Sequence, residues 1–190
     1  MLIYLVLCLA GVQSQRTHTY CLTSQSQIHS DFIRTAFDQW NNYLPPCDKI
    51  SFAGACQDQI NNPNRITIAP IKGTSVGRTT TTTKVVPTEG GRTTQVKTNH
   101  IQIDAERLRY YSLFYNVLLH EVGHAVGLPH PSPLDPTSAM GYRLRLQPDG
   151  YFKYNVISIN DILALLSKRK VVPIMLYPTI VPTHPPRTEM

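Results

Sequence analysis

A chain of 190 residues is long enough to bury one hydrophobic core and too short for two domains of ordinary size. Its 18 Lys and Arg residues outnumber its 12 Asp and Glu residues, which gives a formal charge of +6. These cations are scattered, without the interleaved aromatic residues of a nucleic-acid interface, so we expect no nucleic-acid partner. Two interpretations of the charge stay open: attraction to an acidic glycan or anionic surface, and a basic surface without a binding role. We expect the protein to be a monomer.

An apolar run occupies residues 2–10. It is much shorter than the ~20 residues that a membrane-crossing helix needs. We therefore predict a signal peptide at residues 1–14 and a secreted protein, although no Lys or Arg precedes the run and a buried strand is the alternative. Residues 15–26 are expected to form an N-terminal extension.

Three cysteines, Cys21, Cys47 and Cys56, remain after the predicted cleavage. In an oxidising compartment they predict one disulfide and one free or intermolecular thiol, and the sequence leaves the three pairings open. No C-x-x-C spacing is present, which argues against a metal site built from these cysteines.

The elements expected between residues 27 and 103 alternate between helix and strand. Apolar residues at helical spacing predict a helix over residues 28–40, ended by two prolines at 45 and 46. Alternating apolar residues predict short strands at 50–52, 66–68 and 101–103. The threonine-rich segment 77–99 is predicted to form an irregular hairpin that turns at residues 87–91, and low-complexity disorder is the alternative.

Two more helices are expected after residue 103. Apolar positions predict one helix over residues 113–126. Ser158 and Asp161 have the spacing of a capping box and predict the start of another, with cations at residues 168–170 near its end. Five prolines in the segment 171–190 predict a tail without packed structure.

The segment 120–130 matches the pattern H-E-x-x-H-x-x-G-x-x-H. On a helix, His120 and His124 stand one turn apart on the same face, with Glu121 beside them. Gly127 allows the chain to leave the helix and to bring in His130 as a third ligand. Three nitrogen ligands leave the fourth position of a zinc ion open, which is typical of a catalytic site.

This pattern, followed by Met140 in Ser-Ala-Met-Gly-Tyr, resembles that of the metzincin metallopeptidases. Asn-His-Ile-Gln-Ile-Asp at 99–104, Asn-Asp-Ile at 160–162 and the short spacing from His130 to Met140 are similar to those of a matrixin catalytic domain, over about residues 27–170. The resemblance implies an α+β zincin fold. Its features are a twisted mixed five-stranded sheet with an antiparallel edge strand, three helices, zinc on the central helix, and a cleft for an extended peptide or protein substrate.

Several features depart from matrixins. No P-R-C-G-x-P-D latency segment and no hemopexin-like repeat accompany the match, and we expect Cys47 to form a disulfide rather than block the metal. His100 aligns with a ligand of the structural zinc but lacks partners, so neither structural zinc nor calcium is expected. Met140 is expected to form the apolar floor beneath the metal, or to be an ordinary core methionine. Tyr142, which resembles the astacin and serralysin tyrosine, either donates a hydrogen bond to the oxyanion or packs in the pocket wall.

The motif and the resemblance together predict a zinc endopeptidase of extracellular proteins with one catalytic Zn²⁺. His120, His124 and His130 are the expected ligands, and Glu121 is the expected general base. The alternative from another class is a catalytically inert secreted binding protein on the same scaffold. A threonine- and proline-rich structural component is a third possibility, which predicts no stoichiometric metal.

Overall fold

The computed structural model describes residues 18–23, 29–45, 48–56, 64–88, 90–131, 138–141, 148 and 154–168. The predicted signal peptide at 1–14 and the tail at 171–190 lie outside the described residues, as do Cys47 and Tyr142.

A single mixed sheet contains the five strands β1 (His18–Leu22), β2 (Ile50–Ala55), β3 (Asn64–Ile68), β4 (Gly77–Pro87) and β5 (Thr93–Ile103). Their order across the sheet is β2-β1-β3-β5-β4. The first four strands in this order pair in parallel, and β4 runs antiparallel to β5 at one edge.

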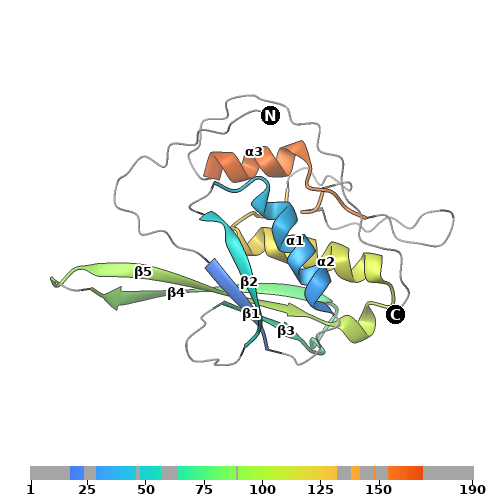
Figure 1. Ribbon diagram of the computed structural model, residues 1–190, viewed down its shortest axis with the longest axis horizontal. Helices are drawn as coiled ribbons and strands as arrows, with labels where there is room; N and C mark the ends of the chain where they lie inside the picture. The colour runs from blue at the N-terminus through green and yellow to red at the C-terminus, as the bar shows by residue number, and fades with distance from the viewer. Residues whose placement is uncertain are drawn as a thin grey trace.

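The helices of the described chain are α1 (Ser30–Asn41), α2 (Tyr111–Ala125) and α3 (Ile159–Lys168), with a 3-10 turn, η3 (Ala105–Arg107), after β5. Figure 1 shows all three α-helices on one side of the sheet, and the β4–β5 hairpin extending beyond the other strands. These findings confirm the predicted α+β class, the mixed five-stranded sheet and the three helices. None of the helices among the described residues has the length and apolar character needed to cross a membrane.

The strand β1 has no counterpart among the predicted elements, because it lies in the segment 15–26 that was expected to be an extension. It pairs with β2 on one side and β3 on the other, and its Tyr20 and Leu22 are buried. Cys21 of β1 forms a disulfide with Cys56, just after β2, with a Cα–Cα distance of 4.9 Å. This bond selects one of the three pairings that the sequence left open, and it excludes the disulfide expected for Cys47 with either of these two cysteines.

The threonine-rich segment forms the predicted hairpin, but its pairing is regular rather than irregular. Eleven successive pairs run from Gly77 opposite Ile103 to Pro87 opposite Thr93. The expected strand at 101–103 is therefore the end of β5. β-Branched threonines favour this extended conformation, and the regular ladder pairs the backbone groups through which β4 and β5 face each other.

The core lies between the sheet and the helices. It fixes α2 against α1 on one side and against the sheet on the other. Trp40 of α1 is fully buried and its Nε1 donates to the carbonyl of Leu119 in α2 at 2.9 Å. On the other side, Asn99 of β5 donates from Nδ2 to the Tyr20 hydroxyl at 2.9 Å and to the carbonyl of Ala125 at 3.1 Å. The C-terminal half of α2 is thus held from two directions.

Candidate metal centre

Helix α2 ends in a turn that redirects the chain toward the third histidine. Gly127 has φ +100°, and its N–H donates to the carbonyl of His124 at 2.8 Å. The N–H of Leu128 donates to the carbonyl of Gly123 at 2.9 Å. This pair of bonds is the Schellman motif, which requires a left-handed residue and therefore favours glycine. The turn brings His130 back over the helix, as the sequence predicted.

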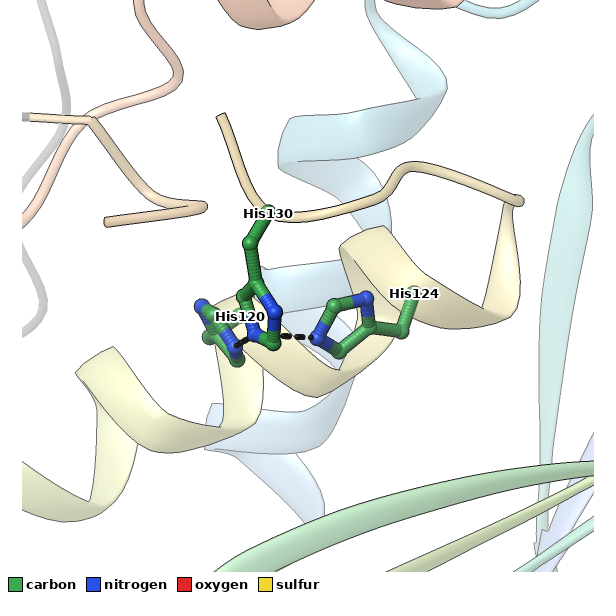
Figure 2. A group of neighbouring side chains, drawn as sticks. All are labelled: His120, His124 and His130. Atoms are coloured by element: carbon green, nitrogen blue, oxygen red, sulfur yellow. Dashed lines mark hydrogen bonds between the residues drawn. The ribbon is translucent and has the colours of Figure 1, made fainter. Parts of the chain in front are cut away.

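The three histidines converge through their Nε2 atoms (Figure 2). The Nε2 of His130 lies 3.1 Å from that of His120 and 3.0 Å from that of His124. The opposite ring nitrogens face backbone carbonyls: His120 Nδ1 lies 3.0 Å from Ala139 O, and His124 Nδ1 lies 2.7 Å from Leu128 O. A carbonyl oxygen only accepts, so both Nδ1 atoms carry the hydrogen and both Nε2 atoms present a lone pair to the centre.

This arrangement of nitrogens fits a bound cation. The Nε2 of His130 carries at most one hydrogen, which can be donated to only one of the other two Nε2 atoms. In at least one of the two short contacts, therefore, two nitrogen lone pairs face each other. Tetrahedral Zn²⁺ with Zn–N bonds of about 2.0–2.1 Å places its nitrogens ~3.3 Å apart, close to the observed separations. Three imidazoles suit zinc. Within the described residues, the ligand atoms of these three histidines lie close enough to one another to hold a metal ion.

The surroundings favour the neutral form of two of the three histidines. Burial, reinforced by the neighbouring His124, lowers the pKa of His120 to about 4. Burial also lowers the pKa of His130. Since the neutral imidazole is the form that binds metal, these shifts favour a loaded site at neutral pH.

Glu121 follows His120 on α2 and packs against the edge strand β4. Its side chain is 5% exposed. Thr79 Oγ1 lies 2.7 Å from Glu121 Oε2 and 2.9 Å from the carbonyl oxygen of the same residue. Gly77 lies so close that a Cβ at this position would be 2.7 Å from Glu121 Oε1. Burial raises the pKa of Glu121, and the hydrogen bond from Thr79 opposes that rise.

The contacts of Gly77 and Thr79 with Glu121 were not among the sequence predictions. Thr79 is separated from Glu121 by 42 positions. Within the threonine run no local pattern distinguishes it from its neighbours, so only the pairing of β4 with β5 and the packing of α2 reveal its place.

The turn at residues 138–141, here called the methionine turn, packs beneath α2. Met140 is 1% exposed. A Cβ on Gly123, between the two helical ligands, would lie 2.2 Å from Met140 Sδ and 2.8 Å from Trp40 Cζ2. The thioether therefore rests directly on the ligand-bearing part of α2, and the same turn supplies the carbonyl that His120 faces.

Helix α3 holds the methionine turn through one carboxylate. The Ser138 hydroxyl donates to the Asp161 carboxylate, and its Oγ lies 2.7 Å from Oδ1 and 2.8 Å from Oδ2. The N–H of Met140 in turn donates to Ser138 Oγ at 2.9 Å. Asp161 also accepts from the N–H of Ser158 at 2.8 Å, and the Ser158 hydroxyl accepts from the N–H of Asp161 at 3.2 Å. The predicted capping box is therefore present and serves the turn as well as the helix.

One of the residues singled out from the sequence, His100, does not join the triad. His100 lies on β5, and its Nε2 is 2.8 Å from the hydroxyl of Thr67. Tyr142 belongs to the segment that the structure does not describe, so its two proposed roles stay predictions.

Comparison with known families and with curated proteins gives no match to this chain.

Proposed function

We propose that the protein is a secreted zinc-dependent endopeptidase that resembles the metzincins, and the matrixins among them. The observation that carries the proposal is the convergence of three Nε2 atoms beside a buried glutamate on the same helix. Three ligands leave a coordination position open, as a catalytic zinc requires. The sheet order with its antiparallel edge strand beside this helix agrees with the fold that the resemblance implies.

In this proposal the chain's own groups have separate tasks. His120, His124 and His130 would hold one zinc ion, which supplies a Lewis acid and lowers the pKa of a water molecule to about 7. Glu121 accepts one proton from that water as the water oxygen bonds to the carbon of the scissile peptide. The C–N bond then breaks, and Glu121 delivers the proton to the departing nitrogen, so the products are a carboxylic acid and an amine.

The substrate class follows from the strand next to the site. β4 is an edge strand, and its outer backbone groups are not used by the sheet in the described chain. An extended peptide can add to such an edge through main-chain hydrogen bonds. The proposed substrate is therefore an extended segment of an extracellular protein.

Secretion is part of the same proposal. The Cys21–Cys56 disulfide is typical of an oxidising compartment. The predicted signal peptide would deliver the chain there.

The test combines metal analysis with a peptide-library digest of the wild-type protein and the Glu121→Ala variant. We expect one zinc per chain in both and cleavage by the wild type. The variant should cleave at least ~100-fold more slowly, because it lacks the general base. It should keep the zinc, because it retains all three histidines. A His124→Ala variant is the control that should lose the metal. A wild-type protein that binds zinc and cleaves nothing would instead favour the inert binding protein.

A further inference from the structure

We propose that Thr79 is a positioning residue that holds the carboxylate of Glu121 in place for its work as general base. This inference rests on the proposed function. It adds a residue of β4 that lies far from the zinc motif in sequence.

The pairing of the hairpin turns Thr79 toward α2. Thr79 lies directly opposite Ile101 in the β4–β5 ladder, so both side chains project from the same face of the sheet. Ile101 is fully buried under the helices. Thr79 is therefore on the helix-facing side of β4 and reaches Glu121, whereas Arg78 and Thr80 project to the opposite face.

The hydroxyl of Thr79 binds one carboxylate oxygen and leaves the other available. It carries a single hydrogen, and the shorter of its two contacts is the one to Glu121 Oε2, at 2.7 Å against 2.9 Å to the backbone carbonyl. A hydrogen bond to a carboxylate is also the stronger of the two kinds. Oε2 is thereby restrained, and within the described residues no hydrogen bond reaches Oε1, the oxygen assigned here to take the proton.

Gly77 makes room for that second oxygen. A Cβ at residue 77 would lie 2.7 Å from Glu121 Oε1 and 2.5 Å from Val117 Cγ1. Both separations are far below the contact distance of ~3.5 Å, so a side chain would displace the carboxylate. The segment Gly77-Arg78-Thr79 thus shapes the position of both oxygens, one by a hydrogen bond and one by the absence of a side chain.

Such a restraint matters because a glutamate side chain has three rotatable bonds. A general base must stand within hydrogen-bond reach of the proton it takes, and a misplacement of ~1 Å can lower a rate by about 100-fold. The other threonines on this face of β4 do not share the contact. Thr81 donates to Asn99 Oδ1 at 2.7 Å, and Thr83 is exposed.

The first experiment compares Thr79→Val, which removes the hydroxyl and keeps the shape, with Thr79→Ser, which keeps the hydroxyl. We expect Thr79→Val to lower kcat between roughly 10- and 100-fold with KM within about twofold of wild type and zinc content unchanged. Thr79→Ser should recover most of kcat. Thr81→Val is the matched control, because it removes a hydroxyl hydrogen bond from the same face of the same strand without touching Glu121.

The second experiment needs no turnover. Urea unfolding of the zinc-loaded wild type, Thr79→Val, Glu121→Ala and the double variant forms a double-mutant cycle. We expect Thr79→Val to lower the unfolding midpoint in the wild type and to have much less effect when Glu121 is absent. Equal effects in the two backgrounds, or an active Thr79→Val with wild-type kcat, would overturn the role of Thr79 alone. A wild-type protein without peptidase activity would overturn the proposed function and this role together.

Discussion

Gly123→Ala is the substitution that the packing around α2 penalises most clearly. An added Cβ would lie 2.2 Å from Met140 Sδ and 2.8 Å from Trp40 Cζ2. Trp40 cannot retreat easily, because it is fully buried and its Nε1 donates to the carbonyl of Leu119 at 2.9 Å. The displacement therefore falls on Met140 and on the methionine turn that carries it.

The size of the effect follows from two opposing contributions. Carbon and sulfur need at least ~3.5 Å, so Met140 must move by more than ~1 Å. Inserting a methyl group into a packed core costs about 1–3 kcal/mol. Alanine in place of glycine inside a helix recovers up to ~1 kcal/mol. Because Met140 must move by more than ~1 Å, the cost lies in the upper part of that range, about 2–3 kcal/mol. After the gain of ~1 kcal/mol is subtracted, we expect the free energy of unfolding to fall by roughly 1–2 kcal/mol.

The same movement should weaken metal binding. Ala139, next to Met140, supplies the carbonyl 3.0 Å from His120 Nδ1. Loss of such an orienting partner typically costs 10- to 100-fold in metal affinity. We expect a zinc dissociation constant raised by about 10-fold or more in the Gly123→Ala variant.

Urea unfolding and competition with a chromogenic chelator measure the two effects. The matched control is the double variant Gly123→Ala with Met140→Ala, in which the shortened side chain frees the space that the methyl group needs. The double variant should be less destabilised than the sum of the single changes. Wild-type stability and zinc affinity in Gly123→Ala would refute the placement of Met140 against α2.

Three other perturbations test separate parts of the structure. Asp161→Ala leaves the buried hydroxyl of Ser138 without its acceptor, so urea titrations should show a loss of about 2–3 kcal/mol, and Asp161→Asn should lose less. Reduction of the Cys21–Cys56 disulfide, which spans 35 positions, should lower the free energy of unfolding by about 3–4 kcal/mol when measured with and without a thiol reductant. Burial lowers the pKa of His29, so the unfolded chain binds this proton more readily and stability should fall as the pH drops below about 6.5. A His29→Phe variant should lose less stability between about pH 7 and about pH 5, and an unchanged acid slope would contradict this reasoning.

The parts of the site that the sequence predicted are those set by local geometry. The helical spacing of His120 and His124, the glycine exit toward His130 and the capping box at the start of α3 each depend on a few neighbouring residues, so a short pattern contains them. The hairpin was also predicted, because its turn residues and its threonines lie in one continuous segment.

The parts that the sequence did not predict depend on pairing between distant segments. β1 has no strong alternation of its own, and its position comes from neighbouring strands on both sides. The disulfide partner of Cys21 follows from that position. Thr79 is one of a run of similar residues, and its contact with Glu121 exists only after β4 has paired with β5 and α2 has packed on the sheet. Tertiary placement of this kind leaves no local signal.

The orientation of the two histidines on α2 depends on parts of the chain outside that helix. Their Nδ1 atoms face the carbonyls of Ala139 and Leu128, which belong to the methionine turn and to the turn that ends α2. Both acceptors are backbone atoms, so a side-chain substitution at either position leaves them in place, and only a shift of the turn removes them. Asp161 holds the methionine turn through the hydroxyl of Ser138. Lys168 donates from Nζ to the carbonyl of Gly127, in the turn that ends α2. Since both side chains come from α3, the packing of this helix contributes to the geometry of a candidate metal centre whose three histidines all lie elsewhere.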